Sequence, residues 1–283
     1  MAEKIGVTPP PGAASAELDF RGKVAFITGA AHGQGRQVAL EFAHAGADVV
    51  ALDVGRQIEY PPVAFGLGDE LTSLKEEIEA LGRQALIGIA DVRCATDVDK
   101  VVTEAIQRFG HIDILFNNAG ICAYAEVDTI ADEALDAMID INLKGPMIVT
   151  RSVVPHMKAA GSGVIINNSS VMGLRGGKRL SHYVASKWGL TGLTKAWAIE
   201  LAPFGIRVVS IHPTGVNTPM NDSLAAMENA TPLEIAERSA GNLLPVPWVE
   251  TEDVAALVLW LASDKARYVT GSQSVLDAGL LSV

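Results

Sequence analysis

Tyr183 and Lys187 are the two residues whose types and spacing point most directly to chemistry. They are four positions apart at the start of a segment with helical periodicity, so both side chains lie on one helical face about one turn apart. A free tyrosine has a pKa of about 10, and a neighbouring ammonium in a site of low dielectric lowers that pKa. Tyr183 could then act as a general base toward an alcohol or as a general acid toward a ketone. Taken alone, the same pair is common on the surface of ordinary helices.

Ser170 lies upstream of this pair and ends a predicted strand. We expect it to reach the carboxyl edge of a parallel sheet, which is the edge where such sheets bind ligands. Its hydroxyl would hold the substrate oxygen by a hydrogen bond. Two histidines, His182 and His212, lie close to the site in sequence, and a structural role is the simpler interpretation of each.

A glycine-rich segment, Gly29 to Gly35, lies between a predicted strand and a predicted helix. Its glycines permit a tight turn, and they let backbone N–H groups and the helix N-terminus approach a pyrophosphate. Close packing of helix on strand is the alternative explanation. Asp53 follows at the end of the next strand, where a carboxylate accepts from both ribose hydroxyls and repels a 2′-phosphate. This order favours NAD over NADP. Arg56 and His32 point the other way, because each would suit a phosphate. Asp53 could also be an ordinary strand-end aspartate that caps a turn.

Further polar residues come at the ends of the third and fourth predicted strands. Asp91 and Val92 follow the third strand, and Asn118, Ala119 and Gly120 follow the fourth. Because the carboxyl ends of parallel strands share one edge of the sheet, we expect these residues to line the same dinucleotide site. Asparagines in this position can instead cap the strand end.

Together these motifs resemble the short-chain dehydrogenase/reductase family, in the right order from Lys23 to about Ala278. The matching segments are Thr28–Gly35, Asn117–Gly120, Ser170 and Tyr183–Lys187. The resemblance implies a catalytic tetrad that consists of Asn142, Ser170, Tyr183 and Lys187. In that tetrad Asn142 would position a water that connects Lys187 to solvent, and Lys187 would also bond the nicotinamide ribose.

The resemblance also implies that Thr218, together with the backbone of Val216, holds the nicotinamide carboxamide. The full set of residues expected to contact NAD is Gly29, Gly33, Gln34, Gly35, Asp53, Asp91, Val92, Asn118, Ala119, Gly120, Tyr183, Lys187, Val216 and Thr218. No metal is expected. The chain departs from the usual family pattern at Gln34, at Thr214, and in a loop after Asp53 that is about a dozen residues longer than usual.

The long loop, with several short segments, resembles one subgroup of the family, the carveol-dehydrogenase-like set that is associated with mycofactocin. These segments are 33–36, 174–176, 213–220 and 247–250. The resemblance implies oxidation of small secondary alcohols, often cyclic or terpenoid. It also implies a tightly held NAD, mycofactocin as a redox partner, and a homotetramer or homodimer.

The rest of the chain supplies elements that would position these residues. The predicted strands cover 23–28, 48–52, 84–90, 113–116, 163–168, 205–211 and 273–276. The predicted helices cover 35–45, 73–81, 95–109, 181–201 and 251–262, and the region 131–157 would form two helices meeting near Gly145 and Pro146. Thr72 or Ser73 would cap the second helix, with Ser73 and Glu76 in a capping box. Thr251 would cap the last.

Strands that alternate with helices, each strand a near-continuous apolar run, predict an α/β fold. We expect a single-domain Rossmann-type doubly wound parallel sheet of about seven strands, with helices on both faces. This domain would cover residues 20–283. Residues 1–19, rich in proline, alanine and glycine, would be a flexible N-terminal tail, and the region 217–249 would be a lid over the site.

Composition limits the classes of function. Apolar residues make up 49% of 283, which is enough for a sizeable core, and the net charge of −11 argues against nucleic-acid and membrane-surface partners. We find no apolar run long enough to span a membrane, and no signal peptide. The two cysteines, Cys94 and Cys122, give neither a disulfide framework nor a metal spacing, which suits a reducing cytoplasm.

Three functions fit these residues. The favoured one is an NAD-dependent alcohol dehydrogenase in which Tyr183 is the general acid or base. An NADPH-dependent 3-oxoacyl reductase of the same fold is the alternative, and Asp53 argues against it. A non-catalytic dinucleotide-sensing regulator is more remote, because a sensor has no need of the complete tetrad that this chain carries.

Overall fold

The computed structural model describes residues 18–61, 68–239 and 241–282. The predicted N-terminal tail lies outside the described residues up to position 17, as does the stretch 62–67 of the loop after Asp53. None of the described helices is both long enough and apolar enough to cross a bilayer.

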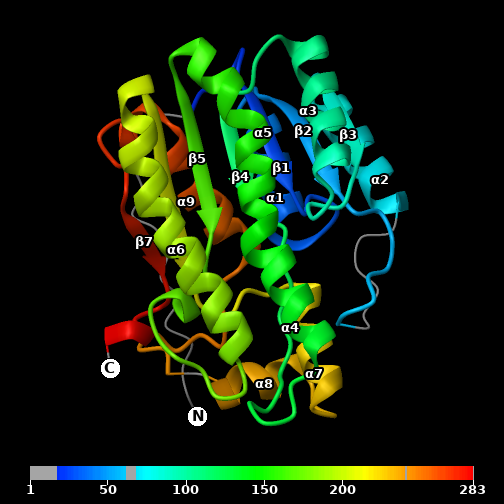
Figure 1. Cartoon of the computed structure of the whole chain (residues 1–283), viewed down its shortest axis with the longest axis vertical. Coiled ribbons are helices and arrows are strands. Elements are labelled where there is room, and N and C mark those ends of the chain that lie inside the picture. Colours follow the sequence, from blue (N-terminus) through cyan, green and yellow to red (C-terminus); the bar gives the residue numbers. More distant parts are fainter. Residues whose placement is uncertain (1–17, 62–67, 240, 283) are drawn as a thin grey trace.

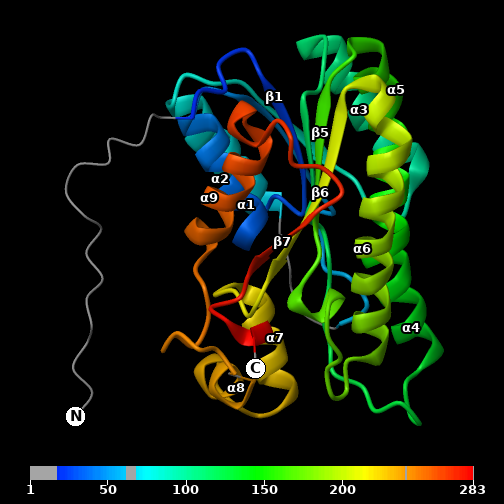
Figure 2. The same cartoon turned by 90° about the vertical axis from the view of Figure 1, so that its left-hand side faces the viewer.

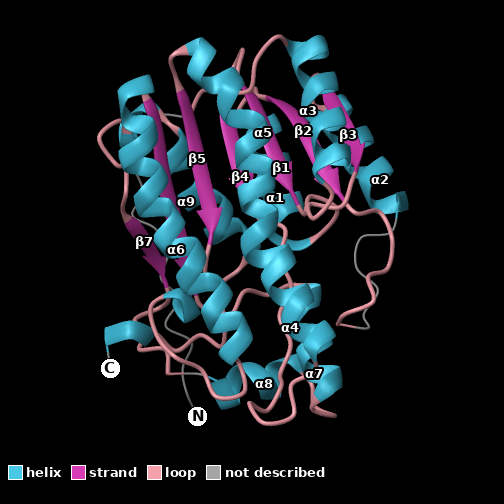
Figure 3. Ribbon diagram, in the orientation of Figure 1, coloured by secondary structure: helices cyan, strands magenta, loops and turns pink. Residues whose placement is uncertain are grey.

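Seven strands of the described chain form one parallel sheet (Figure 3). They are β1 (Val24–Thr28), β2 (Asp48–Asp53), β3 (Ala85–Ile89), β4 (Ile114–Asn117), β5 (Gly163–Asn168), β6 (Ile206–Pro213) and β7 (Gln273–Leu276). Their order in the sheet is β3-β2-β1-β4-β5-β6-β7. The direction of strand order reverses between β1 and β4, which is where doubly wound sheets bind ligands. The predicted fold class is therefore confirmed.

The helices form a layer on each face of the sheet and a small group beyond one edge. Their bounds are α1 (Gly33–His44), α2 (Gly68–Ala80), α3 (Ala95–Phe109), α4 (Asp132–Ile139), α5 (Gly145–Ala160), α6 (Ser181–Leu201), α7 (Pro219–Met227), α8 (Pro232–Ser239) and α9 (Thr251–Ala262). Figure 2 shows α1, α2 and α9 on one face and α3, α4, α5 and α6 on the other. Helices α7 and α8 lie below the carboxyl ends of the strands (Figure 1).

Two apolar clusters, one on each face, hold the layers together. Phe42 of α1, Leu74 of α2 and Val258 of α9 are fully buried against one face. Val102 of α3 and Val153 of α5 are buried against the other. The central strands are apolar throughout because both of their faces are covered.

Three predictions of helix ends need correction. Helix α1 begins at Gly33, two residues earlier than expected. Helix α2 begins at Gly68, so Ser73 lies inside it and donates to Glu77 (3.2 Å) rather than forming the predicted cap. The N-cap of α9 is Glu250, which forms a capping box with Asp253, and Thr251 is the first helical residue.

The predicted junction near Gly145 and Pro146 is confirmed, and it has a special geometry. A π-helical turn, Asp140–Lys144, connects α4 to α5. Such turns are rare and are frequent at functional sites. Asn142 lies in this turn.

Candidate active site

A cleft opens at the carboxyl edge of the sheet, between the ends of the strands and α7. Most of the residues predicted for the site line this cleft, namely Gly29, Gly33, Gln34, Asp53, Asp91, Val92, Asn118, Ala119, Gly120, Ser170, Tyr183, Lys187, Val216 and Thr218. Two predicted residues, Gly35 and Asn142, do not line it. They are buried behind its wall and shape the residues that do.

The glycine turn presents the N-terminus of α1 to the cleft. A Cβ on Gly35 would lie 2.0 Å from the Gly29 carbonyl oxygen, so only glycine allows the chain to pass there. His32, the N-cap of α1, makes no capping hydrogen bond through its side chain, and the first turn carries no acidic residue. The first N–H groups of α1 therefore remain available for an anion such as a pyrophosphate.

A side-chain amide network joins this turn to the ends of β4 and β5. Asn118 Nδ2 donates to the carbonyls of Thr28 and Gly29, at 3.0 Å each. Asn168 Nδ2 donates to Asn118 Oδ1 (2.9 Å) and to Gln34 Oε1 (3.0 Å). Gln34 therefore replaces an aliphatic residue in order to tie the glycine turn to β5. The Asn118 amide is occupied structurally, as the capping alternative predicted.

Asp53 is buried at the end of β2, with 7% of its surface exposed. Oδ2 accepts from the backbone N–H of Ala31 (3.0 Å) and Oδ1 from that of Val54 (2.7 Å). An ionised carboxylate has about four acceptor positions, so both oxygens can still accept a ribose hydroxyl. The two backbone bonds hold the carboxylate at the floor of the cleft, where a 2′-phosphate would meet a fixed negative charge.

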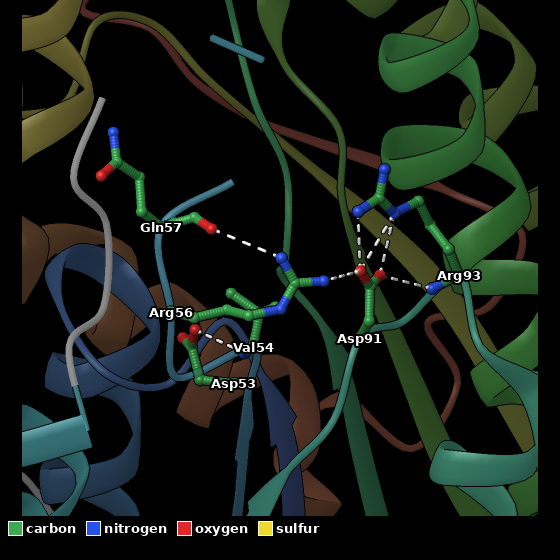
Figure 4. Close-up of polar contacts among 6 residues, drawn as sticks. All are labelled: Asp53, Val54, Arg56, Gln57, Asp91 and Arg93. Atoms are coloured by element: carbon green, nitrogen blue, oxygen red, sulfur yellow. Dashed lines mark hydrogen bonds and ion pairs between the residues drawn. The ribbon is translucent and has the colours of Figure 1, made fainter. Parts of the chain in front are cut away.

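Two arginines converge on Asp91 across the same part of the cleft (Figure 4). Arg93 donates from Nε (3.0 Å) and Nη2 (2.7 Å) to the two carboxylate oxygens of Asp91. Arg56, from the long loop after Asp53, lies 3.6 Å from the same carboxylate. Burial alone would raise the pKa of Asp91, but the hydrogen bonds from Arg93 outweigh it and hold this pKa below its ordinary value.

The described part of the long loop, residues 54–61, folds over the cleft. Ile58 is buried, lines the cleft and joins the apolar cluster on the α3–α6 face. Val54 and Tyr60 pack against the same cluster. Burial also raises the pKa of the Tyr60 hydroxyl. With the Arg56 ion pair, these contacts connect the end of β2 to the end of β3.

Tyr183 and Lys187 lie on one face of α6, as their spacing predicted. Lys187 is buried, and its Nζ lies 5.6 Å from the centre of the Tyr183 ring and donates to the Asn168 carbonyl (2.7 Å). Burial lowers the pKa of Lys187 to about 8. Burial also raises the pKa of Tyr183, and the hydrogen bond with Ser170 opposes this only in part. The predicted lowering of the Tyr183 pKa is therefore wrong for the chain alone, because desolvation, together with the nearby Cys122, outweighs the Ser170 hydrogen bond.

Ser170 is held as the N-cap of a short 3₁₀ turn, Val171–Gly173. Its Oγ accepts from the backbone N–H of Met172 at 3.1 Å. Because this bond uses a lone pair of the oxygen, the hydroxyl hydrogen of Ser170 can still donate, to the Tyr183 hydroxyl or to a substrate oxygen in the cleft.

Asn142 holds the wall behind these residues. Its Oδ1 accepts from the N–H of Ile121 and its Nδ2 donates to the Ile121 carbonyl, both at 2.8 Å. The water that the family resemblance assigns to Asn142 stays a prediction. The neighbouring Cys122 is a buried free thiol whose pKa burial raises to about 12.

The segment after β6 is held by its backbone and by one asparagine. Asn221 Nδ2 donates to the Val216 carbonyl at 2.7 Å. Val216 also forms a parallel bridge to Val249, and the Asn217 N–H donates to the Val249 carbonyl. Thr214, which stands where the family often has the glycine of Pro-Gly, donates its N–H to Leu276 O (3.0 Å), so the hydrogen bonding between β6 and β7 continues through it.

Arg179 connects the lid region to the segment that follows β4. It forms ion pairs with Glu228 at the end of α7 (2.7 Å) and with Glu126 (3.0 Å). Its guanidinium also lies over the ring of Tyr124, 5.3 Å from the centre.

Sequence reasoning missed Asn168 and gave Arg93 no role, and it expected only a structural role for His212. Asn168 follows the carboxyl-edge rule that pointed to Asn118, so that rule could have identified it. His212 is fully buried in β6, with its Nδ1 2.7 Å from the Ser170 carbonyl oxygen. Only the pairing of β5 with β6 brings these two residues together.

Fold and cleft together define a class of protein. A glycine turn at the switch point, an acid at the end of β2 and a Ser-Tyr-Lys cluster at the same edge are the arrangement of a dinucleotide-dependent oxidoreductase. Residues 23–229 match the short chain dehydrogenase family. The chain belongs to this family, which confirms the resemblance found in its motifs.

Known relatives agree with the predicted subgroup. The chain is 42% identical over 269 residues to a (−)-trans-carveol dehydrogenase of Rhodococcus erythropolis, covering 91% of this chain and 97% of that protein. A carveol dehydrogenase from Mycobacterium avium, solved in complex with NAD, superposes with a TM-score of 0.88 at 37% identity, covering 93% of this chain and 99% of that one. The chain is also 38% identical over 265 residues to a 3-oxoacyl-(acyl-carrier-protein) reductase of Thermotoga maritima, covering 93% and 100%.

Proposed function

We propose that this chain is an NAD-dependent dehydrogenase that transfers a hydride between a small apolar secondary alcohol, or its ketone, and the nicotinamide. One observation carries the proposal. A single cleft holds Asp53 at one end, suited to a ribose with free hydroxyls, and Ser170, Tyr183 and Lys187 at the other. The relatives named for carveol support a cyclic or terpenoid alcohol.

The residues of the chain fit the cofactor. The open N-terminus of α1 suits a pyrophosphate. The acceptor positions left on Asp53 suit the adenosine ribose, and Thr218 stands close to the glycine turn, with its Cγ2 3.2 Å from where a Cβ on Gly33 would lie. NAD, when bound, supplies the nicotinamide carbon that accepts or gives the hydride.

The protein's own groups handle the proton and the substrate oxygen. Ser170 donates its hydroxyl hydrogen to the substrate oxygen, and Tyr183 takes the proton of an alcohol or gives a proton to a ketone. Burial favours the protonated Tyr183 hydroxyl. Positive charge beside the ring favours the ionised form, which is the form that acts as a base. Lys187, with a pKa of about 8, supplies part of that charge, and Asn168 fixes its position.

The long loop supports slow exchange of the cofactor. Ile58 lines the cleft and Arg56 reaches across to Asp91, so both would hinder the departure of a bound dinucleotide. A tightly held cofactor would be reoxidised in place, which gives an external redox carrier such as mycofactocin a role by resemblance to the subgroup.

The lid, residues 217–249, supports an apolar substrate. Met220 and Val216 line the cleft from the lid side, and Ile121 lines it from the end of β4. We also propose that residues 20–283 are a single domain, which would put the lid and the cofactor site in one unit.

Exposed apolar side chains support a homotetramer or homodimer. Met147 of α5 and Trp188 and Ile199 of α6 are exposed by 45%, 50% and 79%, and Val275 of β7 is exposed as well. The family resemblance implies that the chain associates through these helices and this strand. Light scattering that gave the mass of a single chain would contradict the assembly.

The function is tested with a panel of cyclic secondary alcohols that begins with (−)-trans-carveol. Each alcohol is supplied with NAD, with NADP, and with a dye as electron acceptor in case the cofactor does not exchange. We expect oxidation with NAD or with the dye. A preference for NADP with a 3-oxoacyl thioester, in the reducing direction, would favour the reductase alternative that the Thermotoga maritima relative represents.

A further inference from the structure

We propose that His212 is a positioning residue that holds the catalytic serine through its main chain. The inference rests on the proposed function of Ser170. His212 is a residue of β6, it does not line the cleft, and it makes its contact with the Ser170 carbonyl oxygen rather than with the hydroxyl.

The contacts of His212 leave little freedom to its ring. It is fully buried, with Nδ1 2.7 Å from the Ser170 carbonyl oxygen and Nε2 2.8 Å from Ser210 Oγ. Ser210 is also fully buried. Both ring nitrogens therefore have partners, in contrast to those of His182, which are buried without any hydrogen-bond partner among the described residues.

These partners determine the tautomer. A carbonyl oxygen can only accept, so Nδ1 of His212 must carry the hydrogen that reaches Ser170. Burial lowers the pKa of His212, and the charge of Lys187 lowers it further, although the bond to the Ser170 carbonyl acts in the other direction. In the neutral ring Nε2 then accepts from the hydroxyl of Ser210.

His212 completes the fixation of Ser170. The Ser170 carbonyl receives a second hydrogen bond, from the N–H of Gly173 (2.9 Å), and Ser170 Oγ receives one from Met172 (3.1 Å). The two bonds from Gly173 and Met172 come from the turn that Ser170 itself begins, and they would move with it. The N–H of the preceding residue, Ser169, donates to Ile211 O of β6 (3.0 Å), and His212 adds the bond from β6 to Ser170 itself.

A merely structural histidine would stabilise β6 without acting on the serine. Positioning of Ser170 and stabilisation of β6 predict different kcat values when only one of the two contacts of the ring is kept. Asparagine places an amide N–H near the position of Nδ1, whereas glutamine reaches the position of Nε2. His212→Asn therefore keeps a donor for Ser170, and His212→Gln keeps a partner for Ser210.

The test measures kcat with the panel alcohol that the unaltered enzyme oxidises fastest. We expect His212→Gln to lower kcat about tenfold, as the loss of one positioning hydrogen bond would, and His212→Asn to stay within about twofold of the unaltered enzyme. In a Ser170→Ala background, His212→Gln should lower kcat no further, because residues that act as one unit are not additive. Val209→Ala, which leaves a cavity in the core beside the same strand, should lower Tm and leave kcat unchanged.

Equal kcat values for the two His212 variants would overturn the inference. So would a fall in kcat on His212→Gln that is as large in the Ser170→Ala background as in the unaltered enzyme. Ser170→Ala with full kcat would instead contradict the proposed function. Imidazole nitrogen NMR of the unaltered protein needs no variant to fold. A hydrogen on Nδ1 of His212 is expected, and a hydrogen on Nε2 alone would refute the proposal.

Discussion

The edge of the sheet and the lid above it are held together in different ways. At the edge, buried amides and hydroxyls bond one another and the backbone: Asn117 donates to Asn167 (2.9 Å), and Asn167 donates to Thr194 (2.9 Å). In the lid, Leu243 and Leu244 are about 60% exposed. Its tie to the far wall is the pair of Arg179 and Glu228.

The difference assigns the chemistry to the edge of the sheet and the choice of substrate to the lid. A buried polar network is costly to leave half satisfied, so the residues at the edge constrain one another. Exposed side chains of the lid, such as Leu243 and Leu244, can change at little cost to stability. We therefore expect substitutions at the edge to lower kcat or cofactor binding. Substitutions in the lid, apart from Thr218 at its start, should act on the alcohol alone.

The largest effect should come from Tyr183→Phe. Removing the hydroxyl takes away the group that exchanges the proton, which lowers kcat by roughly 10²- to 10⁴-fold, while cofactor binding is retained. Tyr268→Phe is the matched control, because Tyr268 is 88% exposed and should keep full activity. Steady-state kinetics of both variants would be compared, and Tyr183→Phe with normal kcat would refute the acid–base role.

Lys187 should make stability depend on pH. Its folded pKa of about 8 lies below its ordinary 10.5, so between these values the unfolded chain binds more protons and stability rises with pH. Relative to Lys187→Met, the unaltered protein should gain about 2 kcal/mol between pH 7.5 and 9.5. Urea unfolding of both proteins at the two pH values measures this gain. A difference that does not change with pH would mean that Lys187 is not desolvated.

Asp53→Ser should weaken NAD binding by roughly 10- to 100-fold, the range for a lost charge-assisted hydrogen bond, and should narrow the preference for NAD over NADP. Titration calorimetry with each dinucleotide would measure both changes. Glu59→Gln removes a nearby exposed charge that does not line the cleft, so it should leave both affinities unchanged. Equal losses of NAD affinity in the two variants would mean that the overall negative charge, and not recognition of the ribose by Asp53, determines the affinity.

The smallest effect should come from Arg179→Met. Loss of the ion pairs with Glu228 and Glu126 loosens the lid, and KM for the alcohol should rise about three- to fivefold, since ion pairs of this exposure contribute little. Both kcat and NAD binding should change by less than about twofold. Arg175→Met, on the same loop and exposed, is the control. A fall in kcat without a change in KM would place Arg179 with the catalytic edge instead.

Local patterns were enough to predict much of the molecule. The helices 95–109 and 181–201 and the strands 163–168 and 273–276 have the bounds predicted for them, because apolar periodicity and end signals agree there. The start of α2 was missed because Ser73 and Glu76 imitate a capping box. The acidic residues Asp69 and Glu70, which suit a helix N-terminus, mark the true first turn.

Site residues were predicted where their own position in the sequence reveals them, and hydrogen-bond partners were missed where they are distant in sequence. Tyr183 and Asp53 follow from spacing and strand ends. Asn168 bonds Gln34 and Asn118, and His212 bonds Ser170, across separations that only the strand order creates. The direction of the Tyr183 pKa shift was also missed, because spacing reveals the amine nearby and not the depth of burial.

Transfer of deuterium from substrate to cofactor tests the central claim most directly. The panel alcohol that reacts fastest is labelled on its carbinol carbon and mixed with the purified protein in a single turnover. Mass spectrometry then examines the dinucleotide released on denaturation. The account predicts a reduced NAD that carries the deuterium, and none in Tyr183→Phe over the same time. Deuterium recovered in water, or in a reduced NADP instead, would contradict it.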